Sequence, residues 1–246
     1  MRAWTLAAVD LIFPPFCPAC EAPLGVDRRD PLCGACWCGI RRLSPPLCAR
    51  CSRPLGAIDP PSMGLAAGGE TRCLECRIDP PAFERARAAG VYTGPLREAL
   101  HAFKFHGKRA LARPLAELIH EQCAPVLASG ADALVPVPLA RARLRERGFN
   151  QADLVADRLG ALCGLPVRRR WLARVRETAP QTALAAAERR GNVRNAFLAE
   201  RRAAGRHVIL VDDVLTTGAT CQESARALRE AGARRVDVVT VARVLG

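Results

Sequence analysis

Aromatic residues are scarce in this 246-residue chain, and no long apolar run is present. Phe, Trp and Tyr together make up 4% of the residues, which gives little support to a surface that binds nucleic acid by stacking bases on aromatic rings. No run approaches the roughly 18 apolar residues that a membrane-spanning helix needs. Asp10 and two prolines interrupt the apolar start of the chain, so it lacks a clean secretory pattern. We therefore expect a cytoplasmic protein without a membrane span.

Lysine is also scarce: Lys104 and Lys108 are the only lysines among 37 basic residues. The formal net charge of +13 indicates an anionic partner. A skew toward arginine of this size is, however, typical of codon bias. We therefore take the charge as weak evidence for nucleic acid and as fair evidence for a ligand that carries phosphate.

The cysteines divide the chain into two parts. Nine of the twelve lie before residue 77, in a stretch rich in Pro and Gly with almost no apolar periodicity. Something other than a hydrophobic core must hold that stretch together. We predict a small cysteine-rich module over residues 1–82 and a larger domain over residues 83–246. Within the module, residues 3–12 predict a short amphipathic helix and residues 56–70 a flexible insertion.

The larger part alternates between strand and helix patterns. Strands are predicted over residues 88–92, 133–137, 171–175, 207–211 and 235–242, and helices over residues 96–103, 111–123, 151–162 and 220–231. This order is typical of an α/β fold with a parallel sheet and helices on both faces. Residues 177–196 show no clear period and predict a mobile loop with some helix over residues 184–190.

Four C-x-x-C pairs stand in the cysteine-rich part, far more than chance would give. Two thiolates at this spacing reach one tetrahedral Zn²⁺, and two pairs complete a closed site with four cysteine ligands. In a reducing compartment such pairs indicate metal or redox chemistry more often than structural disulfides. The predicted metal ligands are Cys17, Cys20, Cys33, Cys36, Cys48, Cys51, Cys73 and Cys76.

We favour sequential pairing of these motifs, with the first two around one Zn²⁺ and the last two around another. The spacing alone also allows the first pair to join the third. A redox C-x-x-C motif or an iron–sulfur cluster is the alternative chemistry. Cys38 stands beside the second pair, either as a bystander thiol or as a substitute for Cys36.

One segment combines an apolar strand, two acids and a hydroxyl-rich turn. After residues 207–211 come Asp212 and Asp213, and then Thr216, Thr217, Gly218, Ala219 and Thr220 open a helix. Backbone N–H groups at a helix N-terminus, with threonine hydroxyls, favour a phosphate monoester. Adjacent carboxylates accept hydrogen bonds from neighbouring sugar hydroxyls. The carboxyl end of a parallel strand is where α/β sheets bind ligands, and neither a Walker A nor a G-x-G-x-x-G motif is present.

This segment resembles the signature of type I phosphoribosyltransferases, in its Asp-Asp form. The resemblance implies a type I phosphoribosyltransferase-like fold that binds 5-phosphoribosyl 1-diphosphate. Asp212 and Asp213 would hold the two ribose hydroxyls, and the turn from Thr216 to Thr220 would bind the 5-phosphate.

The pattern of the whole chain, essentially from end to end, resembles the ComF (competence protein F) family. The matching segments are the cysteine pairs, Phe103-Lys104-Phe105, Pro136-Val137-Pro138 and Arg147-Gly148-Phe149-Asn150-Gln151. The resemblance implies a double zinc ribbon with two structural Zn²⁺ ions. It also implies Mg²⁺ bound with the diphosphate, Lys104 and Arg147 as diphosphate contacts, and residues 178–190 as a hood over the site.

Two functions follow from these observations. The first is an enzyme that transfers phosphoribosyl to an unknown acceptor, with a role in DNA uptake and natural competence. The second is a non-catalytic accessory that binds single-stranded DNA or a competence helicase. Its candidate phosphate contacts are Arg141, Arg143, Arg145, Arg147, Arg168, Arg169 and Arg170.

Overall fold

The computed structural model describes residues 16–25, 30–56, 71–176 and 193–245. The predicted helix over residues 3–12, nearly all of the insertion over residues 56–70, and the hood over residues 178–190 lie outside these ranges. In the described part, no helix has the length and apolar character needed to span a membrane.

Four parallel strands form the main sheet, in the order β1-β6-β5-β2. The strands are β1 (Arg85–Val91), β2 (Ala133–Pro136), β5 (His207–Leu215) and β6 (Arg235–Arg243). Strand β5 was predicted to end at Val211 but continues to Leu215. Asp212 and Val214 still pair with Thr240 and Ala242 of β6. The acid pair therefore lies within the last part of a strand, where the sheet fixes its backbone.

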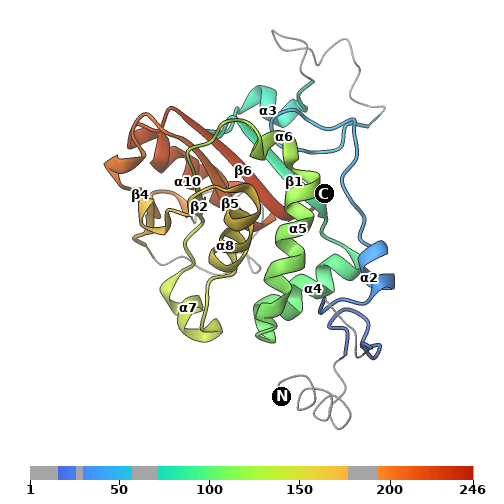
Figure 1. Cartoon of the computed structure of the whole chain (residues 1–246). Coiled ribbons are helices and arrows are strands. Elements are labelled where there is room, and N and C mark those ends of the chain that lie inside the picture. The colour runs from blue at the N-terminus through green and yellow to red at the C-terminus, as the bar shows by residue number, and fades with distance from the viewer. Residues whose placement is uncertain (1–15, 26–29, 57–70, 177–192, 246) are drawn as a thin grey trace.

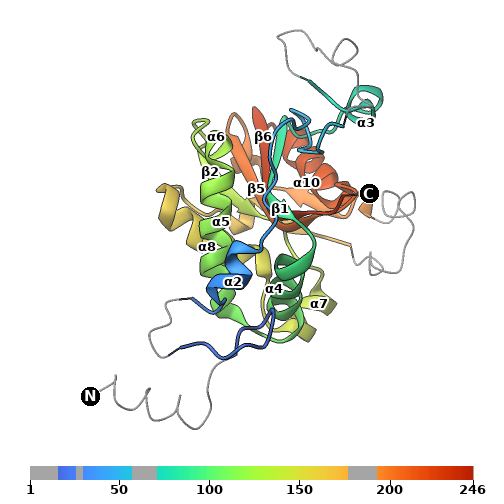
Figure 2. The same cartoon turned by 90° about the vertical axis from the view of Figure 1, so that its right-hand side faces the viewer.

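Helices cover both faces of this sheet, as predicted (Figures 1 and 2). One face carries α4 (Gly94–Phe105), α5 (Ala112–Gln122) and α8 (Gln151–Cys163), and the other carries α10 (Ala219–Glu230). Side chains alternate along β5, so Ile209 and Val211 join the core beneath the three helices, while Val208 and Leu210 join the core beneath α10. The predicted α/β fold is confirmed.

The predicted strand over residues 171–175 does not belong to the main sheet. It forms β3 (Leu172–Arg174), which pairs antiparallel with β4 (Phe197–Ala199) in a separate ribbon. The free edge of β2 is taken instead by residues 166–168, since Leu134 exchanges backbone hydrogen bonds with Pro166 and Arg168 at 3.0 and 2.8 Å. The shorter helices, not predicted from the sequence, are α2 (Gly34–Cys38), α3 (Leu74–Ile78), α6 (Ala124–Leu127) and α7 (Arg141–Arg147).

The cysteine-rich segment covers the outer edge of β1. The backbone N–H of Val91 donates to the Arg41 carbonyl (2.8 Å), and the N–H of Ala86 donates to the Arg50 carbonyl (2.7 Å). An uncovered edge strand is a template for aggregation, so this segment completes the sheet. The two short helices of the segment lie well apart: α2 is beside α4, and α3 is near the other end of β1 (Figures 1 and 2).

Candidate functional site

The eight paired cysteines form two clusters, grouped sequentially along the chain. We call Cys17, Cys20, Cys33 and Cys36 the first cluster, and Cys48, Cys51, Cys73 and Cys76 the second cluster. All four sulfur atoms of each cluster lie within 4.8 Å of one another. The Sγ–Sγ distance is 3.6 Å between Cys20 and Cys33, and 3.7 Å between Cys51 and Cys73. Zinc–sulfur bonds of about 2.3 Å in a tetrahedron place sulfurs about 3.8 Å apart, so each cluster fits one structural zinc ion.

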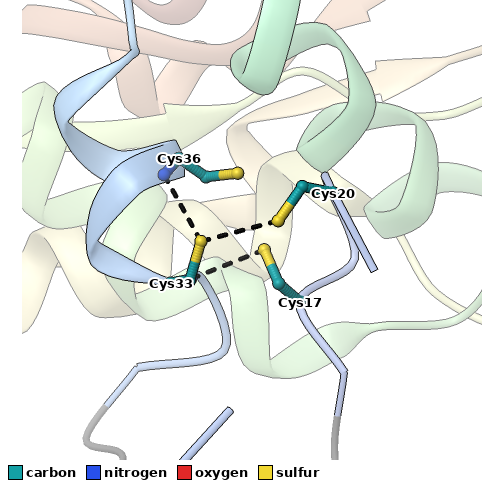
Figure 3. Close-up of side chains that lie close together, drawn as sticks. All are labelled: Cys17, Cys20, Cys33 and Cys36. Atoms are coloured by element: carbon teal, nitrogen blue, oxygen red, sulfur yellow. Dashed lines mark hydrogen bonds between the residues drawn. The ribbon is translucent and has the colours of Figure 1, made fainter. Parts of the chain in front are cut away.

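The first cluster shows how local backbone positions its sulfurs (Figure 3). The N–H of Cys33 donates to the Cys17 sulfur (3.5 Å), and the N–H of Cys36 donates to the Cys33 sulfur (3.4 Å). Helix α2 begins directly after Cys33 and brings Cys36 back toward the pair Cys17 and Cys20. Cys38 is exposed outside the cluster, so Cys36 is the ligand that this geometry selects.

A cavity of about 220 Å³ lies at the carboxyl end of β5. It is bounded by the last turns of α4 and α7, the end of β5 and the start of α10. Seven predicted site residues line it: Lys104, Arg147, Asp212, Asp213, Thr216, Gly218 and Thr220. Thr217 and Ala219 belong to the same turn, but Thr217 is exposed, Ala219 is buried, and neither lines the cavity.

The turn between β5 and α10 is shaped by a glycine. Gly218 caps α10 with φ of 81°, a left-handed conformation that glycine adopts without steric cost. The first N–H groups of a helix have no partner within the helix, and they attract anions. Within the turn, the Oγ1 of Thr217 accepts a weak hydrogen bond from Ala219 N (3.4 Å).

The two carboxylates of the acid pair have different surroundings. Asp212 is partly buried: its Oδ1 accepts from the N–H of Asp213 (2.9 Å), and its Oδ2 lies 3.8 Å from the thiol of Cys221. Burial, followed by the charge of Asp213, raises the pKa of Asp212 to about 7. Asp213 instead forms an ion pair with Lys104, with Nζ 2.9 Å from Oδ2. The pair therefore combines one carboxylate held by its neighbours and one that faces a cation.

Two donors at the cavity have no acceptor. Within the described residues, Nε of Arg147 and Nε2 of Gln151 are buried without a hydrogen-bond partner. A hydrogen bond from Nη1 of Arg147 to Oε1 of Gln151 (3.1 Å) holds the two side chains together. Buried polar atoms are rarely left unsatisfied. Since both orphaned atoms are donors, the group that would complete them is an acceptor such as a phosphate oxygen.

Several lining residues were not singled out from the sequence. They are Tyr92, Leu139, Arg174 and Cys221, whereas Val137, Pro138, Arg143 and Asn150 also line the cavity and belong to segments that the sequence had already indicated. Asn150 belongs to the segment from Arg147 to Gln151. Its amide donates to the Val137 carbonyl (3.0 Å) and its Oδ1 caps α8. Arg174 had no signal in the sequence, because it reaches the cavity from the β3–β4 ribbon.

Two family models match separate parts of the chain. The model described as a double zinc ribbon domain matches residues 8–77, and the model described as a phosphoribosyl transferase domain matches residues 144–245. Among solved structures, the glutamine phosphoribosylpyrophosphate amidotransferase from B. subtilis matches with a TM-score of 0.37 and 25% identity, over 53% of this chain and 26% of that chain. At so low a TM-score, this structure adds nothing to what the topology and the family models establish.

Curated relatives cover most of the chain. The DNA utilization protein YhgH of Salmonella typhi is 34% identical over 241 residues, which are 96% of this chain and 100% of the relative. Competence protein F of Haemophilus influenzae is 33% identical over 178 residues, which are 70% of this chain and 78% of the relative. With two cysteine clusters, a parallel sheet and relatives of this coverage, the chain belongs to the ComF family, which joins a double zinc ribbon to a phosphoribosyltransferase domain.

Proposed function

We propose that the protein binds 5-phosphoribosyl 1-diphosphate, together with Mg²⁺, in the cavity at the end of β5. The observation that carries this proposal is the meeting of an acid pair, a phosphate-type turn and two orphaned donors in one cavity. Asp212 and Asp213 take the ribose hydroxyls, and the turn from Thr216 to Thr220 takes the 5-phosphate. Lys104 and Arg147 take the diphosphate.

The donor set also fits the metal. Mg²⁺ prefers oxygen ligands and is usually held by one or two carboxylates together with substrate phosphates. Asp213 would supply such a carboxylate, since it lines the cavity. When bound, Mg²⁺ would neutralise the charge on the diphosphate. The side chains of this chain would hold the ribose and both phosphate ends in place, and would stabilise positive charge at the sugar if the diphosphate leaves.

We further propose transfer of the phosphoribosyl group to an acceptor, in a cytoplasmic role in DNA uptake or utilisation. A role in DNA uptake or utilisation is supported by the names of two relatives, DNA utilization protein and competence protein. The two cysteine clusters would hold two structural Zn²⁺ ions, because each is closed and offers no open coordination position. Metal analysis should give two zinc ions per chain, and iron would contradict this assignment.

Calorimetric titration of 5-phosphoribosyl 1-diphosphate with Mg²⁺ tests the binding site. The wild type should bind, and a double variant with Asp212→Asn and Asp213→Asn should not. Asp157→Asn serves as the matched control, because Asp157 is an exposed acid outside the cavity that pairs with Arg169. Absence of binding to folded, zinc-loaded wild type would contradict the proposal.

A second candidate function is binding of single-stranded DNA or a competence helicase at α7. None of the residues of α7 is buried, and Arg141 and Arg145 are exposed outside the cavity. Phe105, 53% exposed, contacts the ring of His101 at a tilt of 45° with ring centres 4.8 Å apart, and the guanidinium of Arg147 lies over its ring. An aromatic ring beside arginines is the kind of surface on which unpaired bases stack.

The other predicted phosphate contacts are the arginines at residues 168–170. Arg168 and Arg170 are exposed, but Arg169 already pairs with Asp157, so α7 is the better candidate.

Salt-dependent binding of single-stranded DNA distinguishes this second function. It should survive Asp212→Asn and weaken with Arg141→Ala plus Arg145→Ala, since each lost phosphate contact lowers the salt dependence. Unchanged DNA binding in the double arginine variant would exclude α7 as the surface.

A further inference from the structure

The ion pair between Lys104 and Asp213 lies inside the proposed ligand site. Nζ of Lys104 is 2.9 Å from Oδ2 of Asp213, and the two side chains are only 16% and 15% exposed. Lys104 stands in the last turn of α4, directly after the fully buried Phe103 that anchors this helix in the core. The C-terminal end of a helix also favours a cation. The ammonium group is therefore held at the acid pair by the fold.

Asp213 is the carboxylate of the pair that is open to a cation. Both oxygens of Asp212 already lie beside donors of their own, the N–H of Asp213 and the thiol of Cys221. Nζ of Lys104 lies 2.9 Å from Oδ2 of Asp213, so a divalent ion bound to that oxygen would stand within a few ångströms of the ammonium group. A metal ion and the ammonium group cannot share this position, because like charges a few ångströms apart repel strongly.

We propose that Lys104 is a built-in counter-ion of Asp213, which keeps free divalent cations out of the empty site and releases the carboxylate only to a metal-bound diphosphate. This inference rests on the proposed function, since it takes the diphosphate as the anion that draws Lys104 away. Lys104 is then a specificity-determining residue: the site accepts the metal together with the diphosphate and rejects the metal alone.

The choice of lysine supports this role. Of the 37 basic residues only two are lysines, and one of them stands at this position. Arginine holds a carboxylate with two parallel hydrogen bonds from a rigid planar group, whereas lysine is a point charge on a flexible stem. A counter-ion that must exchange Asp213 for a diphosphate needs a single contact and freedom to turn. Lysine provides both properties.

Binding of Mn²⁺ alone, counted by electron paramagnetic resonance of the free ion, tests the inference in zinc-loaded protein without any diphosphate. Lys104→Met should bind Mn²⁺ about tenfold more tightly than the wild type, because a neighbouring positive charge is removed. Adding Asp213→Asn to this variant should abolish the gain. Lys108→Met is the matched control, since Lys108 is exposed in the same segment and does not line the cavity. It should bind Mn²⁺ as the wild type does.

Two more variants guard against a folding defect. Lys104→Gln should repeat the gain of Lys104→Met, and Lys104→Arg, which keeps the charge, should bind Mn²⁺ as weakly as the wild type. If folded Lys104→Met and Lys104→Gln bind Mn²⁺ no better than the wild type, the inference is overturned. Titration of the wild type with 5-phosphoribosyl 1-diphosphate and Mg²⁺ tests the proposed function separately. Ligand binding without a Mn²⁺ gain refutes only the counter-ion, and a Mn²⁺ gain without ligand binding refutes the ligand assignment.

Discussion

The two cysteine clusters have the same four ligands but are attached to the sheet in different ways. In the first cluster Cys20 is exposed and Cys33 is half-buried, yet Cys17 and Cys36 pack into the large core together with α4 and α5. In the second cluster all four cysteines are buried, but they form a small apolar group of their own with only Leu55 packed beside them among the described residues.

Hydrogen bonds hold the second cluster to the sheet. Nη1 of Arg243 donates to the Cys51 carbonyl (2.7 Å), and Nη1 of Arg87 donates to the Ala49 carbonyl (2.9 Å). In return, the hydroxyl of Ser52 donates to the carbonyl of Ala86 in β1 (2.7 Å). Apolar packing tolerates small rotations, whereas hydrogen bonds depend on direction. We therefore expect the second cluster to need its metal to hold these carbonyls in place, and the first cluster to depend on its metal less.

The largest expected difference comes from removing one ligand of each cluster. Cys73→Ser should lower the Tm by about 10 °C, since a structural zinc site contributes several kcal/mol to folding and about 1 kcal/mol corresponds to roughly 2–4 °C in a chain of this size. Cys20→Ser should cost about half as much, because Cys20 is exposed and water can replace it. Calorimetry of both variants checks this, and an equal or larger loss for Cys20→Ser would contradict the comparison.

A substitution in the acid pair should raise the stability of the protein, in contrast to the cysteine substitutions, which should lower it. The pKa of Asp212 is raised to about 7, so the folded state binds this proton more tightly than the unfolded state, whose Asp pKa is about 3.9. Stability is therefore lost as the pH rises from about 4 to 7, while Asp212 becomes charged only in the unfolded chain. Asp212→Asn should stabilise the protein by about 4 kcal/mol at pH 8, with little gain near pH 4.

Melting curves across this pH range measure the effect. Both cluster variants should keep the same pH dependence of Tm as the wild type if they leave the end of β5 intact. A gain for Asp212→Asn that is equal at pH 4 and pH 8 would show that burial of its charge is not the cause.

Arg243→Ala removes the main attachment of the second cluster without touching a ligand. Arg243 is 8% exposed, so the Cys51 carbonyl would lose a charged donor in a buried place. We expect a loss of about 2 kcal/mol in the free energy of unfolding, measured by urea denaturation. Arg42→Ala is the control beside the first cluster. Arg42 donates a 3.4 Å hydrogen bond to the Ile40 carbonyl, and its guanidinium carbon lies 5.8 Å from the centre of the Trp37 ring. The substitution should therefore lower the free energy of unfolding by about 0.3 kcal/mol at most. A similar loss for both variants would remove the distinction between the clusters.

The smallest effect should appear in the rate of zinc release. With a chelator in excess, the first cluster should lose its ion about tenfold faster than the second, which corresponds to about 1.4 kcal/mol in the barrier. The reason is that Cys20 is open to solvent, whereas every sulfur of the second cluster is buried. Two phases of zinc release, with the faster one accelerated by Cys20→Ser and the slower one unchanged, would assign the phases. A single phase would indicate that both ions are equally protected.

Elements with a strong apolar period were predictable from the sequence. The predicted helix over residues 151–162 is α8, and the predicted strand over residues 235–242 is β6, with bounds off by one residue. The end of β5 was not predictable, because its last four residues are strand only through pairing with β6. The place of β3 was also missed, since a three-residue strand carries no information about which edge it joins.

The sequence by itself determined the parts of the site that are local. The four C-x-x-C motifs and the segment from Asp212 to Thr220 are short stretches whose residues are neighbours in the chain, so they could be singled out as candidate ligands before the fold was known. Only the tertiary structure decided that Lys104 faces Asp213, that Arg174 reaches the cavity, and that Arg243 holds the second cluster. These contacts join segments that are far apart in the chain, and they form only because the packing of helices on the sheet brings them within a few ångströms.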